Sequence, residues 1–216
     1  RSTDNGTNWD NVTSPTTNNL YGVTFGNDTL VAGGTYGNIV RSTDNGTNWD
    51  NVTSPTANHL MEVTFGNNTF VAVGYSGNIV RSTDNGTTWD NVTSPTANSL
   101  FGVGFGNNTF VAVGSSGNIV RSTDNGSTWD NATSPTANNL LQVVFGNNTL
   151  VAGGTYGNIV TTNNGITWDN ATSSTTNHLY GVTLGNDTFV TVGESGYIIR
   201  STDNGTNWDN VTSPTT

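Results

Sequence analysis

The chain has 216 residues, with five Arg, no Lys and fifteen acidic residues, and its formal net charge is −10. This balance argues against a nucleic-acid partner, which needs a basic surface, and against attraction to anionic membranes. The absence of Cys excludes disulfides and thiolate metal sites. No apolar run approaches the roughly 18 residues of a membrane helix, so we expect no membrane insertion.

The sequence repeats itself along its whole length. The string RSTDNGTNWDNVTSPT begins at Arg1 and returns at Arg41, and its variants follow at intervals of 40 or 39 residues. Self-similarity at this period is typical of stacked repeat architectures. We therefore predict one domain, residues 1–216. Its repeat units are about 18–57, 58–97, 98–137, 138–176 and 177–216.

One unit contains four short segments with the composition of β-strands. In chain order they are Leu20 to Phe25, Leu30 to Gly33, Ile39 to Ser42 and Trp49 to Thr53. They are rich in Val, Ile, Phe and Thr, and Asn-Gly or Gly-Asn steps between them supply the positive φ of tight turns. Simple alternation places Tyr21, Val23 and Phe25 on one face of the first strand.

Four strands in a unit of about 40 residues are the signature of a propeller blade. Five copies of the first three strands are present, which predicts an all-β fold, a five-bladed β-propeller of four-stranded antiparallel blades. The fourth strand occurs six times, because residues 1–17 are identical to residues 200–216. We expect a closed ring in which these two segments compete to complete the last blade. The spare strand is then a means of self-association between copies.

The segment Ser2 to Trp9 resembles the Asp-box, the S-x-D-x-G-x-T-W motif of bacterial neuraminidase repeats. The copies ending at Trp89, Trp129 and Trp168 keep the Thr before Trp, and the fifth copy has Thr161 for Ser and Asn163 for Asp. The unit also looks like the repeats of photosystem II assembly-factor propellers and of secreted bacterial repeat proteins. This resemblance implies that the motif is a structural hairpin between the third and fourth strands.

Local chemistry supports the same interpretation of the Asp-box. A short carboxylate can accept hydrogen bonds from backbone N–H groups of its own turn, and Gly46 suits positive φ. We expect the Trp rings to be buried between blades in near-equivalent sites. The Asp-box residues are Asp4, Asp44, Asp84, Asp124 and Asp203, with Trp9, Trp49, Trp89, Trp129, Trp168 and Trp208.

Two kinds of chemistry compete with this structural interpretation. Alternating oxygen side chains in the motif suggest calcium, but the spacing lacks the pattern of an EF-hand loop, so we expect no metal and no cofactor. Resemblance to neuraminidases suggests three converging arginines. However, Arg41, Arg81, Arg121 and Arg200 share one repeat position, which prevents convergence on a single substrate. No catalytic constellation is visible, and we predict that the chain is not an enzyme.

The turn between the second and third strands and the loop before the first strand vary most between copies. Both positions lie on the rim opposite the Asp-boxes, where propellers bind ligands. Neutral drift in exposed turns is the competing explanation. The candidate ligand contacts are Tyr36, Tyr75, Tyr156, His59 and His178.

These features favour a non-enzymatic structural or adhesive module of the extracellular space or the cell surface, and they leave room for a subunit of a repetitive or filamentous assembly. The alternatives are a multivalent carbohydrate-binding lectin, an assembly factor and, last, a sialidase-like enzyme. Asn-x-Ser/Thr sequons are dense, which suits a glycosylated surface. The glycosylation candidates are Asn11, Asn51, Asn91 and Asn210.

Overall fold

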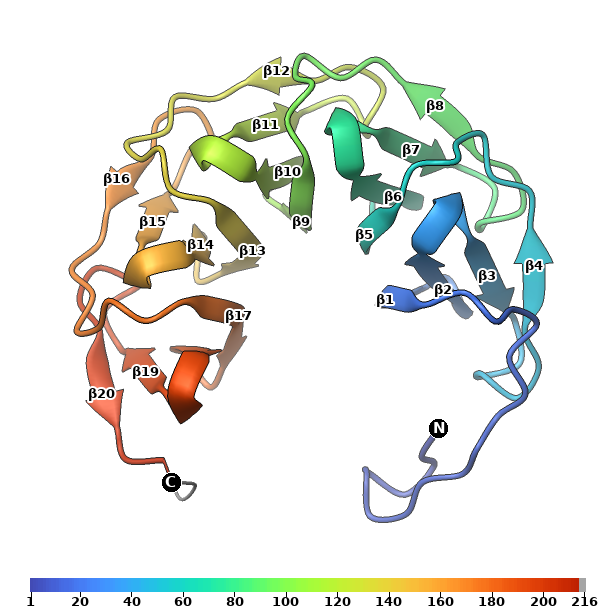
Figure 1. The fold of residues 1–216 in the computed structure, drawn as a ribbon, viewed down its shortest axis with the longest axis horizontal. Coiled ribbons are helices and arrows are strands. Elements are labelled where there is room, and N and C mark those ends of the chain that lie inside the picture. The colour runs from blue at the N-terminus through green and yellow to red at the C-terminus, as the bar shows by residue number, and fades with distance from the viewer. Residues whose placement is uncertain (214–216) are drawn as a thin grey trace.

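The structure, a computed structural model, describes residues 1–213 of the chain. It contains five sheets of four antiparallel strands, and within each sheet the strands follow one another in chain order. Figure 1 shows these sheets as blades arranged around a common centre, with the first strand of each blade innermost and the fourth outermost. The prediction of an all-β, five-bladed architecture is confirmed.

Blade 1 contains β1 (Leu20–Gly26), β2 (Thr29–Gly34), β3 (Ile39–Ser42) and β4 (Asp50–Val52). Blade 2 contains β5 (Leu60–Gly66), β6 (Thr69–Gly74), β7 (Ile79–Ser82) and β8 (Asp90–Val92). Blade 3 contains β9 (Leu100–Gly106), β10 (Thr109–Gly114), β11 (Ile119–Ser122) and β12 (Asp130–Asn131). Blade 4 contains β13 (Leu140–Gly146), β14 (Thr149–Gly154), β15 (Ile159–Thr162) and β16 (Asp169–Asn170). Blade 5 contains β17 (Leu179–Gly185), β18 (Thr188–Gly193), β19 (Ile198–Ser201) and β20 (Asp209–Val211).

The turn residues explain why the strands end where they do. Asn27 and Asp28 join β1 to β2 with φ of 47° and 55°, the left-handed values that a two-residue hairpin needs. A short 3₁₀ turn, Thr35–Gly37, joins β2 to β3, and its central residue Tyr36 has φ of 57°. Every later blade repeats both turns, so local chemistry sets the blade unit.

A β-bulge changes the predicted alternation of the first strand. In β5 the register shifts between Leu60 and Glu62, and equivalent shifts occur in the other four first strands. The extra residue turns Leu60 to the same side as Val63 and Phe65, and all three pack in one cluster. Simple alternation had separated the leucine from the other two, and it was wrong because it took no account of the bulge.

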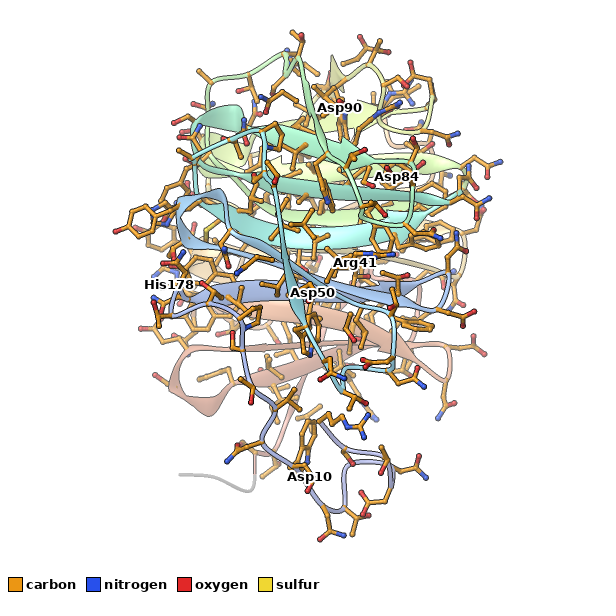
Figure 2. The ribbon with its side chains drawn as sticks, turned by 90° about the vertical axis from the view of Figure 1, so that its right-hand side faces the viewer. Asp10, Arg41, Asp50, Asp84, Asp90 and His178 are labelled. Carbon is orange, nitrogen blue, oxygen red and sulfur yellow. The ribbon has the colours of Figure 1, made fainter. Side chains whose placement is uncertain are left out.

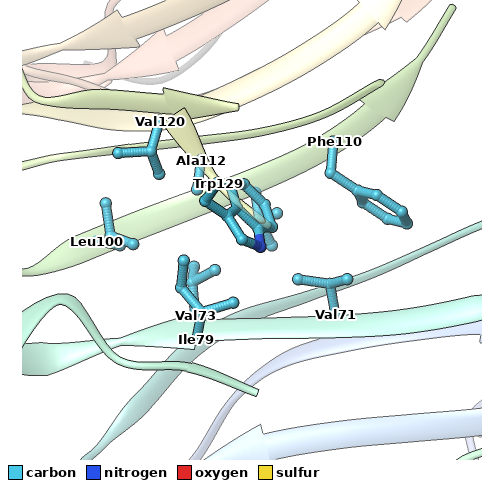
Figure 3. Packing of buried hydrophobic residues seen from close by; sticks show 9 residues of the cluster. Val71, Val73, Ile79, Leu100, Phe110, Ala112, Val120 and Trp129 are labelled. Atoms are coloured by element: carbon cyan, nitrogen blue, oxygen red, sulfur yellow. The ribbon is translucent and has the colours of Figure 1, made fainter. Parts of the chain in front are cut away.

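The core lies between the blades. Each of four hydrophobic clusters combines side chains from two neighbouring blades. Figure 3 shows one of them, where Val71, Val73 and Ile79 of blade 2 face Leu100, Phe110 and Trp129 of blade 3. Each blade is thus stabilised mainly by its neighbours, as in other repeat proteins.

The ring is open, and our expectation of a closed ring was wrong. Figure 1 shows a gap between blade 1 and blade 5, with the N-terminal segment on one side of it and β20 on the other. Leu20 is 40% exposed and Val23 is 61% exposed, whereas their equivalents in blade 2, Leu60 and Val63, are 0% and 3% exposed. The angle between packed blades sets the curvature, and five blades at this angle leave the arc incomplete.

The N-terminal segment, residues 1–17, does not complete blade 5. The C-terminal copy of this sequence supplies β20, which pairs with β19; residues 214–216 of that copy lie outside the described part. The N-terminal copy contains no assigned strand and folds into a hairpin closed by two backbone hydrogen bonds between Arg1 and Asp10, of 2.7 and 2.8 Å. Figure 2 shows Asp10 beyond the edge of the blades, so this segment lies outside the five sheets, next to blade 1.

Candidate functional site

Each turn that resembles the Asp-box, and for which we keep that name, is a self-contained hydrogen-bonded turn on one rim of the arc. Asp44 Oδ1 accepts hydrogen bonds from the Ser42 hydroxyl at 2.9 Å and from the backbone N–H of Asn48 at 2.9 Å. Its Oδ2 accepts from the Asn48 side-chain amide at 2.7 Å. The Trp49 indole N–H donates to the Gly46 carbonyl, so one carboxylate and one ring organise the whole turn.

These hydrogen bonds make the box carboxylates unusually acidic. The backbone N–H of Asn48, followed by its side-chain amide, lowers the pKa of Asp44 to about 2. The pKa values of Asp4, Asp84, Asp124 and Asp203 are lowered to about 2 in the same kind of turn. The carboxylate oxygens are therefore engaged within the turn as acceptors from protein donors.

The fifth Asp-box corrects our alignment of the repeats. Thr162, not Thr161, takes the place of the motif serine, because it pairs with Leu150 as Ser122 pairs with Phe110. Asn164, not Asn163, replaces the aspartate, and its Oδ1 accepts hydrogen bonds from Ile166 and Thr167. This repeat is one residue shorter than the others, and the missing residue falls inside the turn. The turn is closed by the amide oxygen of Asn164 instead of a carboxylate.

The six Trp sites are not equivalent, contrary to our expectation. Trp89, Trp129, Trp168 and Trp208 are buried, Trp49 is half-buried and Trp9 is 74% exposed. Each buried ring packs against the blade that precedes its own, as Trp89 packs on Val31 and Ile39 of blade 1. In the part of the chain that the structure describes, Trp49 faces the N-terminal segment instead of a four-stranded blade, and Trp9 lies in a segment without assigned strands.

Three of the repeated arginines, Arg1, Arg41 and Arg81, each link one repeat to the next on the Asp-box rim. Arg41 Nε donates to the Asn85 carbonyl of the next blade at 2.6 Å. Arg81 donates to the Asn125 carbonyl and the Ser127 hydroxyl in the same way. Arg1 donates to the Asn45 carbonyl at 3.2 Å and to Thr47 Oγ1 at 2.7 Å. These arginines point along the ring from blade to blade and do not meet at one place.

On the opposite rim, the structure brings three of the candidate ligand contacts together. Figure 2 shows His178 on the side of the ribbon opposite Asp84 and so locates this rim. The His59 ring is stacked on Tyr75, with centroids 5.1 Å apart, and lies 5.2 Å from the Tyr36 ring of the preceding blade. We call Tyr36, His59 and Tyr75 the first rim cluster.

A second rim cluster, Tyr156, His178 and Tyr180, lies between blades 4 and 5. The His178 ring is 5.2 Å from Tyr156 and 6.4 Å from Tyr180. Tyr180, on the first strand, was not among our candidates, although its position varies between copies. Glu194 stands where the first cluster has Tyr75, and its Oε2 accepts a hydrogen bond from the backbone N–H of His178. Each cluster offers exposed aromatic faces beside polar groups.

The loop position of the two histidines also has a structural role that sequence reasoning missed. His178 Nδ1 accepts a hydrogen bond from the backbone N–H of Tyr156 in the preceding blade, at 3.1 Å. Asn139 and Ser99, at the same repeat position, accept from Ser116 and Ser76. The only signal in the sequence was that these side chains carry an acceptor atom. The position joins adjacent blades whether or not it contacts a ligand.

A half-buried glutamate lies on the innermost strand of blade 2. Burial raises the pKa of Glu62 to about 7, although the Val63 N–H and the Gln142 side chain partly oppose this shift. Gln142 occupies the equivalent position in blade 4, and Gly102 lies between them in blade 3. A Cβ atom on Gly102 would lie 3.2 Å from Gln142 Oε1, so the missing side chain leaves room for the amide.

The four sequon asparagines considered as glycosylation candidates are exposed. Asn51 Nδ2 donates to the Pro15 carbonyl, and Asn91 Nδ2 donates to the Pro55 carbonyl, each at 2.9 Å. Asn210 Oδ1 accepts from the Ser174 hydroxyl. This repeat position therefore bridges consecutive repeats, which explains its recurrence on structural grounds.

Within residues 1–213, no group of three or more His, Cys, Asp or Glu side chains is arranged to hold a metal ion. The same range contains no helix that is long and apolar enough to cross a membrane.

Five four-stranded antiparallel blades with hydrophobic cores between them define a β-propeller. Residues 23–135 match the DUF6242 beta propeller domain, and the chain belongs to this family. No curated protein matches the chain by sequence.

Solved structures show the same fold at low sequence identity. YCF48 bound to a D1 peptide is 17% identical, with a TM-score of 0.74 over 96% of this chain and 72% of that chain. YCF48 from Cyanidioschyzon merolae is 18% identical, with a TM-score of 0.70 over 93% of this chain and 74% of that chain. The computationally designed protein Ika8 is 13% identical, with a TM-score of 0.69 over 89% of this chain and 60% of that chain.

Proposed function

We propose that the chain is a non-enzymatic structural and adhesive module of an extracellular or cell-surface assembly, and that it adheres through the rim opposite the Asp-boxes. The observation that supports adhesion is the recurrence of an aromatic–histidine cluster between blades 1 and 2 and between blades 4 and 5. Two related sites on one rigid rim would bind a repetitive surface by avidity.

A carbohydrate is the ligand class that these clusters fit best. Tyr36 is 71% exposed and Tyr156 is 67% exposed, so each presents an open ring face beside a half-buried histidine. The apolar C–H face of a sugar packs on such a ring, while its hydroxyl groups bond to adjacent imidazole or carboxylate groups. His59 and His178 supply the imidazoles, and Glu194 adds a carboxylate to the second cluster.

The structural neighbours favour a second candidate. One YCF48 structure holds a D1 peptide, and its fold matches 96% of this chain. A propeller rim of this kind could hold an extended peptide, with tyrosine contacts giving affinity. An assembly-factor-like function would then replace the adhesive one.

The test compares matched variants on glycan and peptide arrays. Tyr36→Ala and Tyr156→Ala each remove one exposed ring. Ser116→Ala is the control, because Ser116 occupies the same turn position with φ of 57° in a blade without such a cluster. Glycan binding that each Tyr substitution weakens and Ser116→Ala leaves unchanged supports the carbohydrate ligand. Peptide binding with the same pattern supports the second candidate, and binding unaffected by both Tyr variants excludes the rim.

The extracellular location has its own test. Intact mass of the protein from its natural host, before and after enzymatic removal of N-linked glycans, should differ if Asn11, Asn51, Asn91 or Asn210 is modified. An unchanged mass equal to that of the polypeptide contradicts the glycoprotein part of the proposal.

A further inference from the structure

The arc ends in two unlike apolar faces. We call the exposed side of blade 1, with Leu20, Val23 and Phe25, the leading face. The exposed side of blade 5, around Gly185 and Val192, is the trailing face. Phe25 is 56% exposed and Val192 is 48% exposed, whereas Val73, the blade 2 equivalent of Val192, is completely buried. Large exposed apolar surfaces of this kind mark interaction sites.

The interfaces between neighbouring blades show which kind of surface would be complementary to the leading face and to the trailing face. At every junction between blades, a glycine at the end of one first strand receives a large side chain from the next blade. A Cβ atom on any of these glycines would overlap that side chain. The pairs are Gly26 with Phe65, Gly66 with Phe105, Gly106 with Phe145 and Gly146 with Leu184. Gly185 has nothing within 4 Å of its Cβ position, and Phe25 has no glycine before it.

A cavity on each face marks the missing neighbour. The leading face holds one of about 300 Å³, lined by Leu20, Val23, Ala32, Trp49 and, from the N-terminal segment, Val12. The trailing face holds one of about 220 Å³, lined by Val182, Val190 and Val192 among others. At the junction of blades 1 and 2, the corresponding space is filled by Val31 and Ile39 of the preceding blade.

We propose that the trailing face of one copy of this chain docks on the leading face of a second copy, with Phe25 of the second copy seated on Gly185 of the first. The interface would continue the four interblade contacts already present. It deepens the proposed structural role, since it says how copies would join, but it does not involve the rim, so the two proposals can fail separately.

The leading and trailing faces contact each other between copies because the rigid arc holds them apart within one chain. Closing the gap seen in Figure 1 would require the tight contacts at all four junctions, three between glycine and phenylalanine and one between glycine and leucine, to shift. Joining unlike faces is head-to-tail association, which grows as an open chain when it does not close. The gap in Figure 1 is narrower than the five-bladed arc, so a second copy does not fit within the same ring. It has to be displaced along the ring axis, and repeated docking of this kind gives a helical filament.

We call the N-terminal segment the plug, because it covers part of the leading face and a docking blade can displace it. It holds blade 1 through the two hydrogen bonds of the Arg1 side chain. Residues 200–216 have the same sequence, so Arg200 of a docking blade 5 can replace Arg1 contact for contact. Docking then replaces the N-terminal segment of one copy with the identical C-terminal segment of the other. It also places the three inner strands of that copy's blade 5 over Leu20, Val23 and Phe25.

The experiment measures mass by sedimentation velocity over a concentration series, in salt that screens the repulsion between chains of net charge −10. Besides the wild type, Val12→Asp weakens the plug, Phe25→Asp disrupts the leading face and Gly185→Leu fills the trailing face. Tyr36→Asp on the rim is the control. Circular dichroism establishes that each variant is folded.

We expect the wild type and the Tyr36→Asp variant to form species heavier than 22.6 kDa as concentration rises, and Val12→Asp to do so at lower concentration. Phe25→Asp and Gly185→Leu should each stay monomeric. Mixed together they should form a 1:1 dimer and nothing larger, because each variant keeps one intact face. Monomeric behaviour of both the wild type and Val12→Asp overturns the proposal, as does assembly of either face variant alone.

Discussion

Asp44 and Asn48 are joined by two hydrogen bonds, one from the backbone N–H to Oδ1 at 2.9 Å and one from the side-chain amide to Oδ2 at 2.7 Å. Both bonds favour the charged carboxylate, and the same pairing recurs between Asp4 and Asn8 and between Asp203 and Asn207. The motif thus combines turn geometry with a dependence on pH.

The Asp-boxes should make the protein sensitive to strong acid. Their pKa of about 2 in the folded state lies below the ordinary value of 3.8, so the folded state binds fewer protons than the unfolded state between these values. Stability from the boxes is therefore complete above pH 5 or so and is lost as the pH falls through 3.8 toward 2. Urea unfolding at a series of pH values measures this slope.

Two reciprocal variants check the origin of the acid effect. Asp84→Asn should reduce the slope between pH 4 and pH 2, because it removes one acidic box. Asn164→Asp should increase it, since it restores a carboxylate to the one box that has an amide. Equal slopes in both variants would show that other carboxylates cause the acid sensitivity.

Glu62→Gln should stabilise the protein above about pH 4.5, with the full effect reached above pH 7. The raised pKa of Glu62, about 7, means that the folded state holds a proton that the unfolded state releases above pH 4.5. Stability therefore decreases as the pH rises from 4.5 to 7. Removing this charge should raise the free energy of unfolding at pH 8 by up to about 3 kcal/mol, and by little at pH 4.

The control for this substitution is Glu194→Gln, which alters an exposed carboxylate on the rim. Gln142 provides a natural precedent, since the same amide occupies the equivalent position in blade 4. If Glu62→Gln stabilises equally at both pH values, the effect comes from packing and not from ionisation.

The interblade glycines predict a contrast between two identical substitutions. Gly66→Ala places a Cβ atom against the Phe105 ring and should destabilise the fold by about 1–3 kcal/mol, the usual cost of overpacking. Gly185→Ala makes the same change at the same repeat position where no neighbour lies within 4 Å. It should be neutral in the monomer, and an equal loss in both variants would mean that the backbone and not the neighbour requires glycine.

Tryptophan fluorescence should resolve one accessible indole. Trp9 is 74% exposed and Trp129 is 6% exposed, so a soluble quencher should act mainly on Trp9. Trp9→Phe should shift the remaining emission to shorter wavelength and remove most of the quenching. Trp129→Phe serves as the comparison and should leave the quenched component in place; similar effects from both would contradict the exposed N-terminal segment.

The blades could be predicted from the sequence because the information that defines them is local. The predicted strand from Ile39 to Ser42 agrees with β3, and the hairpins form where Asn and Gly tolerate positive φ. The candidate contacts Tyr36 and His59 were found from variation between copies, but sequence alone gave no reason for Tyr36 to approach the histidine of the next blade.

The sequence by itself determined the number of blades, their strands and the Asp-box turns, since each depends on residues within a few positions of one another. Only the tertiary structure decided how the blades meet. The bulge that brings Leu60 beside Val63, and the seating of Phe65 on Gly26, set the angle between blades through packing between distant segments. That angle leaves the arc open, exposes Phe25 and Gly185, and places the N-terminal segment before blade 1, none of which a count of repeats could reveal.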